Sequence, residues 1–268
     1  MERILVGVDG STESRRALEW AGGLARRTRA AVVAVQVGHT VKDRSAEHGQ
    51  DPLVDIAAHC PVSVDAQILE GDPAAVLLDA ASDERADLLV VGMRGSGGFL
   101  HLHLGSVAQH LARHTSLPLA MVPAVANQSV EHVIVGVDGS SGSLGAIAFA
   151  ADLAADLEVG ATAVYAFEPL VEWVPANDPT GWQRHARDQV REWTAAFEQA
   201  GVALAVEIDR DIHPVAALSR ALDAHPAAIA VVGTRGRGGF AGLHLGRVPS
   251  QLVHQTGAAV VLVPTPVR

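Results

Sequence analysis

The stretch VVGMRGSGGFLHLHLGS, residues Val90–Ser106, runs from an apolar, strand-like segment into a loop that holds five glycines. The stretch VVGTRGRGGFAGLHLGR, residues Val231–Arg247, repeats most of it. Glycine lets the backbone adopt positive φ and approach a bulky anion closely. A glycine-rich loop between a buried strand and a helix is therefore a candidate phosphate site, although a tight turn explains one such loop equally well.

The repeat extends over the whole chain. ILVGVDGST (Ile4–Thr12) recurs as VIVGVDGSS (Val133–Ser141), and LGSVAQHLARHTSLPLAMVP recurs as LGRVPSQLVHQTGAAVVLVP. The copies start 129 residues apart but their glycine loops lie 141 apart, so the second half carries extra residues in between. The sequence predicts two tandem domains, 1–123 and 131–268, joined by the polar segment Ala124–Val130.

Short valine-rich and leucine-rich runs alternate with helical patterns in both halves. In the first half we expect helices from Ser11 or Thr12 to about Arg27, from Pro73 and from Ser106. The second half adds a helix from about Trp182 to Gln199. This alternation predicts an α/β fold of two tandem doubly wound domains, each a five-stranded parallel sheet with helices on both faces.

Composition excludes several classes of protein. A formal charge of −10 gives no electrostatic footprint for nucleic acid or for an anionic membrane. No apolar run approaches the length of a membrane span, and the start of the chain lacks the zones of a signal peptide, so we expect a cytoplasmic protein. The single cysteine, Cys60, excludes an internal disulfide and is expected to be an inert thiol.

Ligands of open doubly wound sheets bind beyond the carboxyl ends of the strands, where the winding reverses. Asp9 and Gly10 follow the first predicted strand, and the glycine loop Gly92–Gly98 follows the fourth. If the winding reverses between these strands, both sets face one crevice. The helix that starts near Gly105 adds unpaired N–H groups that suit a phosphate chain, while Asp9 suits ribose hydroxyls or a base.

Gly92, Gly95, Gly105 and Ser106 form the pattern G-x2-G-x9-G-S between a predicted strand and a predicted helix. This pattern resembles the ATP-binding signature of the universal stress protein family, and the resemblance covers both halves. It implies the strand order 3-2-1-4-5 and the binding of ATP, ADP or AMP, with Mg²⁺ left open as a companion of the nucleotide. It also implies pairing through the last strand of each half, either within one chain or in a homodimer.

The resemblance places Asp9 at the adenosine end and the backbone of Val37 at adenine, with Asp138 and Ala166 as their second-half counterparts. The full candidate nucleotide-binding set is, in the first half, Asp9, Gly10, Val37, Gly92, Arg94, Gly95, Gly97, Gly105, Ser106 and Val107, and in the second half, Asp138, Gly139, Ala166, Gly233, Arg235, Gly236, Gly246, Arg247 and Val248.

The second half departs from the family pattern. Arg247 replaces the signature serine or threonine, so that it either joins Arg235 and Arg237 in a clamp on phosphate or fills the site. Isoleucine and histidine at 212–213 replace glycine and aspartate at 71–72. In the first half, the tract Lys42–Asp51 and the run Pro52–His59 leave room for only a stub of the second helix, which predicts a more open site. The intact signature favours the first half as the nucleotide site, and binding by both halves stays open.

No Ser-His-Asp order, lysine-containing P-loop or paired carboxylates accompany the candidate site, so no catalytic residue is predicted and ATP hydrolysis is at most slow. The histidine cluster His101, His103, His110 and His114 is expected to be satisfied locally rather than to bind metal. Trp173, Trp182 and Trp193 are interpreted as packing beneath a loop, with a partner-binding surface as the alternative.

The sequence therefore predicts an adenine-nucleotide-binding regulator of a stress response that acts on an unidentified protein partner. Two alternatives stay open. The first is a structural member of the family in which the glycine loops are only turns. The second is an enzyme that cleaves ATP between its α and β phosphates.

Overall fold

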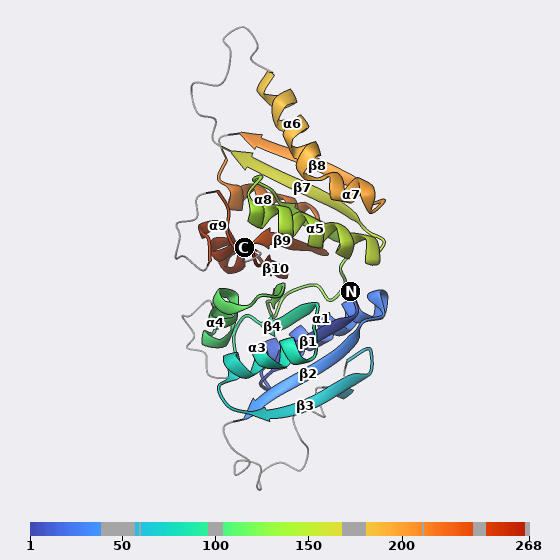
Figure 1. Cartoon of the computed structure of the whole chain (residues 1–268), viewed down its shortest axis with the longest axis vertical. Coiled ribbons are helices and arrows are strands. Elements are labelled where there is room, and N and C mark those ends of the chain that lie inside the picture. The colour runs from blue at the N-terminus through green and yellow to red at the C-terminus, as the bar shows by residue number, and fades with distance from the viewer. Residues whose placement is uncertain are drawn as a thin grey trace. The chain divides into compact units, whose positions relative to one another are not determined.

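The chain forms two compact units, Met1–Val130 with Gly257–Val261 and Glu131–Thr256 with Leu262–Arg268 (Figure 1). The structure, a computed structural model, describes residues 1–38, 57–58, 60–95, 104–167, 181–210, 212–237 and 245–265. Gly97, His101, His103, Trp173 and nearly all of the stretch from Lys42 to His59 lie outside these residues, so the expectations placed on them stay predictions.

The first unit alternates strands and helices in the predicted order. Its elements are β1 (Arg3–Val8), α1 (Thr12–Thr28), β2 (Ala31–Gly38), β3 (Val64–Glu70), α3 (Pro73–Asp83), β4 (Leu88–Gly92), α4 (Ser106–His114) and β5 (Leu119–Val122). The strands lie in the order β3-β2-β1-β4-β5, and each neighbouring pair is parallel. The predicted sheet and strand order are confirmed.

The second unit repeats this arrangement. Its elements are β6 (His132–Gly136), α5 (Ser141–Asp156), β7 (Gly160–Phe167), α6 (Gly181–Trp193), α7 (Ala195–Gln199), β8 (Leu204–Arg210), α8 (Pro214–Ala224), β9 (Ala228–Gly233) and α9 (Arg247–Gln255). The last strand of the repeat is β10 (Val260–Val263), of which Leu262 and Val263 belong to this unit. The strand order is β8-β7-β6-β9-β10. The single helix expected from Trp182 to Gln199 is wrong in one respect, because Thr194 separates α6 from α7. The buried Thr194 hydroxyl donates to the Val190 carbonyl over 2.7 Å, and its backbone leaves the helical region at φ −96° and ψ 14°.

Local sequence signals explain where the helices begin. The Ser11 hydroxyl accepts from the Ser14 amide over 3.1 Å, and the Asp72 carboxylate accepts from the Ala75 amide over 3.0 Å. Each bond satisfies one of the amides that the first turn of a helix leaves without an intrahelical partner. Pro73 stands at the first position of α3, where its missing N–H costs nothing. These caps fix α1 and α3 at the carboxyl ends of the strands.

The winding of the sheet reverses between β1 and β4. Strand β1 pairs with β2 on one side and with β4 on the other, with Val8 opposite Gln36 and Gly7 opposite Val91. Right-handed crossovers then place α1 and α3 on opposite faces of the sheet. Ile4, Leu5 and Val6 have no exposed surface, so the middle of β1 is the core of the unit. The carboxyl ends of β1 and β4 are left side by side, as the ligand rule for such sheets requires.

The connecting segment at 124–130 lies along α1. The Gln128 amide donates to the Glu19 carboxylate over 2.6 Å, and the Arg27 guanidinium donates to the Val130 carbonyl over 2.5 Å. A Cβ on Gly23 would lie 2.7 Å from the Gln128 carbonyl oxygen, so only glycine lets the segment approach this closely. The predicted linker is thus held to the first unit by side-chain and backbone contacts.

Cys60 packs on the same helix. Its Sγ lies 3.8 Å from the Leu18 carbonyl oxygen, and burial raises the pKa of the thiol, with Glu19 adding to the rise. A raised pKa lowers the thiolate fraction at neutral pH, which fits the inert role expected from the sequence.

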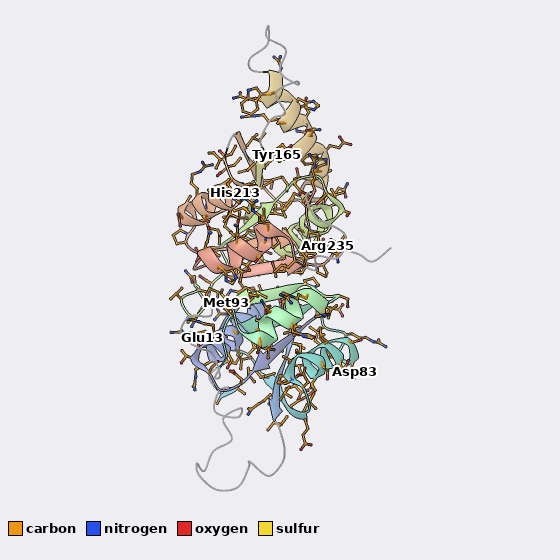
Figure 2. The ribbon with its side chains drawn as sticks, turned by 90° about the vertical axis from the view of Figure 1, so that its left-hand side faces the viewer. Glu13, Asp83, Met93, Tyr165, His213 and Arg235 are labelled. Atoms are coloured by element: carbon orange, nitrogen blue, oxygen red, sulfur yellow. The ribbon has the colours of Figure 1, made fainter. Side chains whose placement is uncertain are left out.

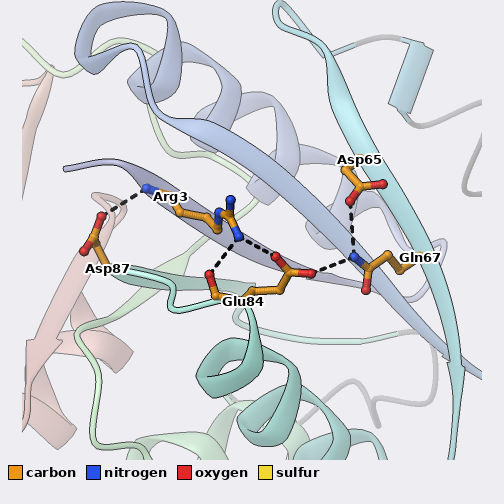
Figure 3. A network of polar contacts seen from close by, with 5 residues as sticks. All are labelled: Arg3, Asp65, Gln67, Glu84 and Asp87. Carbon is orange, nitrogen blue, oxygen red and sulfur yellow. Dashed lines mark hydrogen bonds and ion pairs between the residues drawn. The ribbon is translucent and has the colours of Figure 1, made fainter.

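A network of polar contacts surrounds Arg3 and Glu84 in the first unit (Figure 3). The Arg3 guanidinium reaches the Glu84 carboxylate over 2.7 Å and the Glu84 carbonyl over 3.0 Å. The Gln67 amide donates to the other Glu84 oxygen over 2.9 Å, and Asp87 accepts from the Arg3 amide over 3.0 Å. The network therefore joins β1, β3 and the end of α3, three segments that are far apart in the sequence.

We expect Arg3→Met to lower the free energy of unfolding by about 1 kcal/mol, because it removes two hydrogen bonds at a partly buried position and keeps the apolar stem. Urea unfolding followed by circular dichroism measures the change. Arg16→Met is the matched control: it breaks only the exposed pair of Arg16 with Glu19, three residues on, and should change stability by less than about 0.5 kcal/mol. Equal effects of both variants would show that the network contributes no more than a surface ion pair.

Two stacked histidines occupy the amino-terminal edge of the second sheet. The rings of His132 and His225 lie 4.1 Å apart and nearly parallel, at 9°, and His132 Nε2 lies 2.9 Å from the Thr162 hydroxyl. Burial lowers the pKa of His132 below its ordinary value, and the neighbouring His225 lowers it further. The folded state therefore favours the neutral ring.

This pair predicts a pH dependence of stability. Because the folded pKa of His132 is lower than the unfolded one, the unfolded state binds more protons as the pH falls through about 6.5. The stabilisation is complete above this pH and is lost as the pH falls through the folded pKa. Thermal unfolding of the parent chain should lose more stability between pH 7.5 and pH 5.5 than that of His132→Gln. Parallel losses in both proteins would exclude His132 as the group responsible.

Candidate functional site

A pocket of about 530 Å³ opens at the carboxyl ends of β1, β2 and β4 in the first unit. Pockets of this size hold small organic ligands. The lining includes every first-half candidate residue except Gly10 and Gly97, namely Asp9, Val37, Gly92, Arg94, Gly95, Gly105, Ser106 and Val107. Gly97 lies outside the described residues, and Gly10 forms the turn beside Asp9 with φ +83°. The fold therefore brings together side chains that the sequence separates by about a hundred residues.

Other lining residues form an apolar floor that the motif search did not single out. They come from the ends of β1, β2 and β4 and from the first turns of α3 and α4: Gly7, Val8, Val35, Pro73, Leu77, Val91, Met93, Leu104 and Ala108. Gln36 also lines the pocket, and its Oε1 is a buried atom without a hydrogen-bond partner among the residues that the structure describes. The signal for Gln36 was a lone polar residue in the otherwise apolar run AVVAVQV.

The Asp9 carboxylate is held at the start of α1. One oxygen accepts from the Ser11 amide over 3.0 Å, while the Asp9 amide donates to the Ser14 hydroxyl oxygen over 3.3 Å. A Cβ on Gly95 would lie 2.5 Å from the other carboxylate oxygen, so a side chain there would displace the carboxylate. The second glycine of the signature is thus required by Asp9, across the crevice.

The first and third glycines of the signature have different surroundings. A Cβ on Gly92 would lie 2.9 Å from the carbonyl carbon of Glu13, so this glycine makes room for the start of α1. A Cβ on Gly105 would find its nearest neighbour, the Met93 carbonyl oxygen, at 3.4 Å, which is an ordinary contact. Gly105 caps α4 without a side-chain hydrogen bond. The protein alone therefore explains Gly92, whereas Gly105 leaves space at the amino terminus of a helix, where anions bind.

An ion pair lies at the edge of the pocket. Arg94 Nη2 lies 3.3 Å from Glu13 Oε1, and the Glu13 side chain is 19% exposed. Figure 2 labels Glu13 on the first unit. Glu13 was not a candidate in the sequence analysis, because its role follows from the position of α1 against β4.

The second unit places Asp138 in the same way. One carboxylate oxygen accepts from the Ser140 amide over 2.9 Å and the other from the Arg237 amide over 2.9 Å, and a Cβ on Gly236 would overlap the latter oxygen. Burial by itself raises the pKa of Asp138, but hydrogen bonds from Ser140, Arg237 and Ser143 outweigh it and lower the pKa below its ordinary value. Asp138 is therefore a stable carboxylate in the loop after β6.

An aromatic cluster stands beside Gly139, which has φ +74°. Trp193 at the end of α6 meets Tyr165 edge to face at 5.3 Å, and the Arg237 guanidinium lies 5.2 Å from the centre of the Trp193 ring. Tyr165 precedes Ala166, the residue expected at adenine. Packing by Trp193 is thus observed. Trp182 lies at the start of α6 and is partly exposed, and Trp173 lies outside the described residues.

Arg247, the substituted signature residue, begins α9 beside Val248. Its Nη2 lies 3.3 Å from Nε2 of His213, the residue that caps α8. The first two signature glycines, Gly233 and Gly236, keep their close contacts, since a Cβ on Gly233 would lie 2.6 Å from the Gly142 backbone. The substitution therefore changes the charge of this crevice and leaves the packing of β9 against α5 intact.

His110 and His114, the two members of the histidine cluster that the structure describes, contact each other. The rings of His110 and His114 stack at 4.1 Å, and His114 Nδ1 lies 2.9 Å from the His110 carbonyl oxygen. Within the described part of the chain, no three histidine, cysteine, aspartate or glutamate side chains gather as metal ligands. The helices described also include none with the length and apolar character needed to cross a bilayer.

Comparisons with known proteins agree with the repeat. The sequence profile of the Universal stress protein family matches residues 1–123 and again residues 129–264. Universal stress protein Rv2623 of Mycobacterium tuberculosis is 30% identical over 293 aligned residues, which cover 97% of this chain and 95% of that protein. Universal stress protein Mb2019 of Mycobacterium bovis is 28% identical over 308, covering 98% and 95%. The crystal structure of a universal stress protein from Archaeoglobus fulgidus shares the fold, with a TM-score of 0.68, 14% identity and 98% of each chain covered.

The chain therefore belongs to the universal stress protein family, as a member with two tandem copies of the family domain. This confirms the resemblance drawn from the glycine signature and the repeat.

The two glycines of the signature should respond differently to alanine. Gly92→Ala should lower the free energy of unfolding by about 1–3 kcal/mol, because its Cβ overlaps the Glu13 backbone. Gly105→Ala has room and should change stability by less than about 0.5 kcal/mol. Urea unfolding of both variants tests this. A large loss in Gly105→Ala would mean that the protein, rather than a ligand, requires glycine at that position.

Proposed function

We propose that the pocket of the first unit binds an adenine nucleotide and that the protein acts as a nucleotide-dependent regulator in a stress response. The observation that carries the proposal is the convergence of Asp9, Gly95 and Gly105 on one pocket of about 530 Å³. Family membership supports it, because universal stress proteins commonly bind adenine nucleotides.

Different parts of the pocket offer different chemical groups, and these match the parts of a nucleotide. The amino terminus of α4, with Gly105 and Ser106, offers backbone amides and a hydroxyl to phosphate groups. Asp9 is an acceptor for ribose hydroxyls. At the β2 end, Val37 borders an apolar floor suited to a base, and the unpartnered Gln36 Oε1 is an acceptor for an exocyclic amino group.

A binding switch needs a ligand that stabilises one state over another. In this proposal, phosphates bound to the glycine loop between Gly92 and Ser106 supply the difference in affinity, and a partner protein responds to whether the site is occupied. The sequence indicates no residue as a catalytic base, so the proposed role is regulatory, with at most slow ATP hydrolysis. Whether Mg²⁺ accompanies the nucleotide belongs to the same test.

Isothermal titration of the purified chain with ATP, ADP, AMP and adenosine, with and without Mg²⁺, tests the proposal. Gly105→Ala should weaken nucleotide binding about tenfold, because the added Cβ crowds the approach of phosphate while the fold is kept. Asp9→Ala should weaken ATP and adenosine alike, since it acts at the nucleoside end.

Two controls make the result decisive. Arg16→Met lies outside the pocket and should bind as the parent chain does. The second control checks whether the purified protein already carries a nucleotide. Heating the protein releases bound small molecules, and anion-exchange chromatography then identifies them. Unchanged affinity in both Gly105→Ala and Asp9→Ala would refute the site, and no bound nucleotide by either method would favour a structural role. Release of AMP with pyrophosphate would favour the enzyme alternative.

A further inference from the structure

Helix α6 of the second unit is fixed mainly at its carboxyl end. It lies against β8 (Figure 1), and of its residues Gly181–Trp193 only Ala186 and Val190 are buried. Trp193 is its last residue, next to the break at Thr194. Most of the stability of a helix in a protein comes from the packing of its apolar face, and this face is small. The contacts of Trp193 therefore contribute a large share of what holds α6 in place.

Trp193 packs on the turn that follows β6. Its ring meets Tyr165 of β7 edge to face at 5.3 Å, and Tyr165 is itself buried in the sheet. A Cβ on Gly139 would overlap Trp193 Cζ2, so the ring occupies space that only glycine leaves free. At Gly10, the matched glycine of the first unit, a Cβ would meet no heavy atom within 4 Å among the residues that the structure describes. Within the described residues, a ring therefore covers this turn in the second unit and not in the first.

Arg237 connects the same ring to the loop after β9. Its backbone amide donates to the Asp138 carboxylate over 2.9 Å, and its guanidinium lies 5.2 Å from the centre of the Trp193 ring. A Cβ on Gly139 would lie 2.7 Å from Arg237 Nη2, so the side chain passes over this turn on its way to α6. A guanidinium at this distance from the face of a tryptophan is attracted by the negative charge of the ring face. Arg237 is therefore held at both ends, by Asp138 and by Trp193.

These contacts link the inside of the second unit to its surface. Arg237 follows the carboxyl end of β9, and Asp138 follows the carboxyl end of β6. Doubly wound sheets bind ligands and change shape at these strand ends. A displacement of the loop that carries Arg237 draws the guanidinium away from the ring, because the Arg237 amide is tied to the loop after β6. Helix α6 then loses one of the few contacts that fix it.

We propose that the contact between Arg237 and Trp193 is a latch that couples the docking of α6 to the position of the loop after β9. While the guanidinium lies on the ring, α6 is docked against β8 and the Arg237 amide is held on Asp138. When the guanidinium leaves the ring, α6 opens more often and the Arg237 amide exchanges faster. Such coupling is reciprocal, so a change at either end alters the other. The latch does not depend on the nucleotide proposed for the first unit.

Hydrogen–deuterium exchange of the full chain, measured by mass spectrometry on peptides that cover α6, tests the latch. Arg237→Gln should raise amide exchange in α6 about two- to fivefold, because the open state gains the population that an exposed cation–π contact suppresses. Arg237→Lys keeps a cation for the ring and should stay within about twofold of the parent chain. Arg235→Gln is the matched control, since it removes the same charge from the same loop and should leave exchange in α6 unchanged.

The reverse direction distinguishes a latch from ordinary packing. Trp193→Leu keeps an apolar side chain near Tyr165 but removes the ring that Arg237 contacts, so exchange of the Arg237 amide, followed by NMR, should rise about two- to fivefold. Circular dichroism checks that each variant is folded. Unchanged exchange in α6 of Arg237→Gln, an equal rise in Arg235→Gln, or a rise of one size throughout the second unit would overturn the latch. An unchanged Arg237 amide in Trp193→Leu would also overturn it, because Trp193 would then only pack.

Discussion

The close approach of the first helix of each unit to the end of the fourth strand is the constraint on which both crevices depend. In the first unit α1 comes so near β4 that only glycine fits at position 92, and in the second α5 does the same at Gly233. This contact fixes where the loop after the first strand lies. Asp9 and Asp138 are thereby carried to the glycine loop on the other side of the crevice. A side chain at Gly92 or Gly233 would move the helix start and the carboxylate together.

The same constraint distinguishes glycines that packing requires from a glycine that leaves space for a ligand. The sequence motif alone does not distinguish them. In the motif all glycines look alike, as residues that let a backbone approach a phosphate. The contacts assign Gly92 to helix packing and Gly95 to the Asp9 carboxylate, and leave Gly105 as the position at which the protein itself makes no demand for glycine. Some glycines of the signature are therefore required by the packing of the domain, and only the others concern the ligand.

Sequence reasoning was strongest where the signal was periodic or local. The alternation of apolar runs with helical patterns predicted the order of strands and helices, and Ser11 and Pro73 predicted the starts of α1 and α3. It was weaker where the outcome depended on one buried contact: the Thr194 hydroxyl bonds back to the chain and divides a helix that periodicity makes continuous. Glu13 could not be selected from the sequence, because its proximity to Arg94 exists only once α1 is packed against β4, and Gln36 left only a weak signal, as a lone polar residue in an apolar run.

The divergence between the two crevices is built into the backbone as well as the side chains. Gly142 cannot be replaced by glutamate without moving the Arg235 carbonyl, so the ion pair of the first unit has no simple route into the second. By contrast, Glu13 has room beside Arg94, and its carboxylate reduces the charge that the first crevice offers to an anion. Duplicated domains with one fold can thus differ in the charge beside their crevices through the space left beside a single helix turn. In the first unit that space admits a glutamate which pairs with the arginine of the glycine loop, and in the second it admits only glycine.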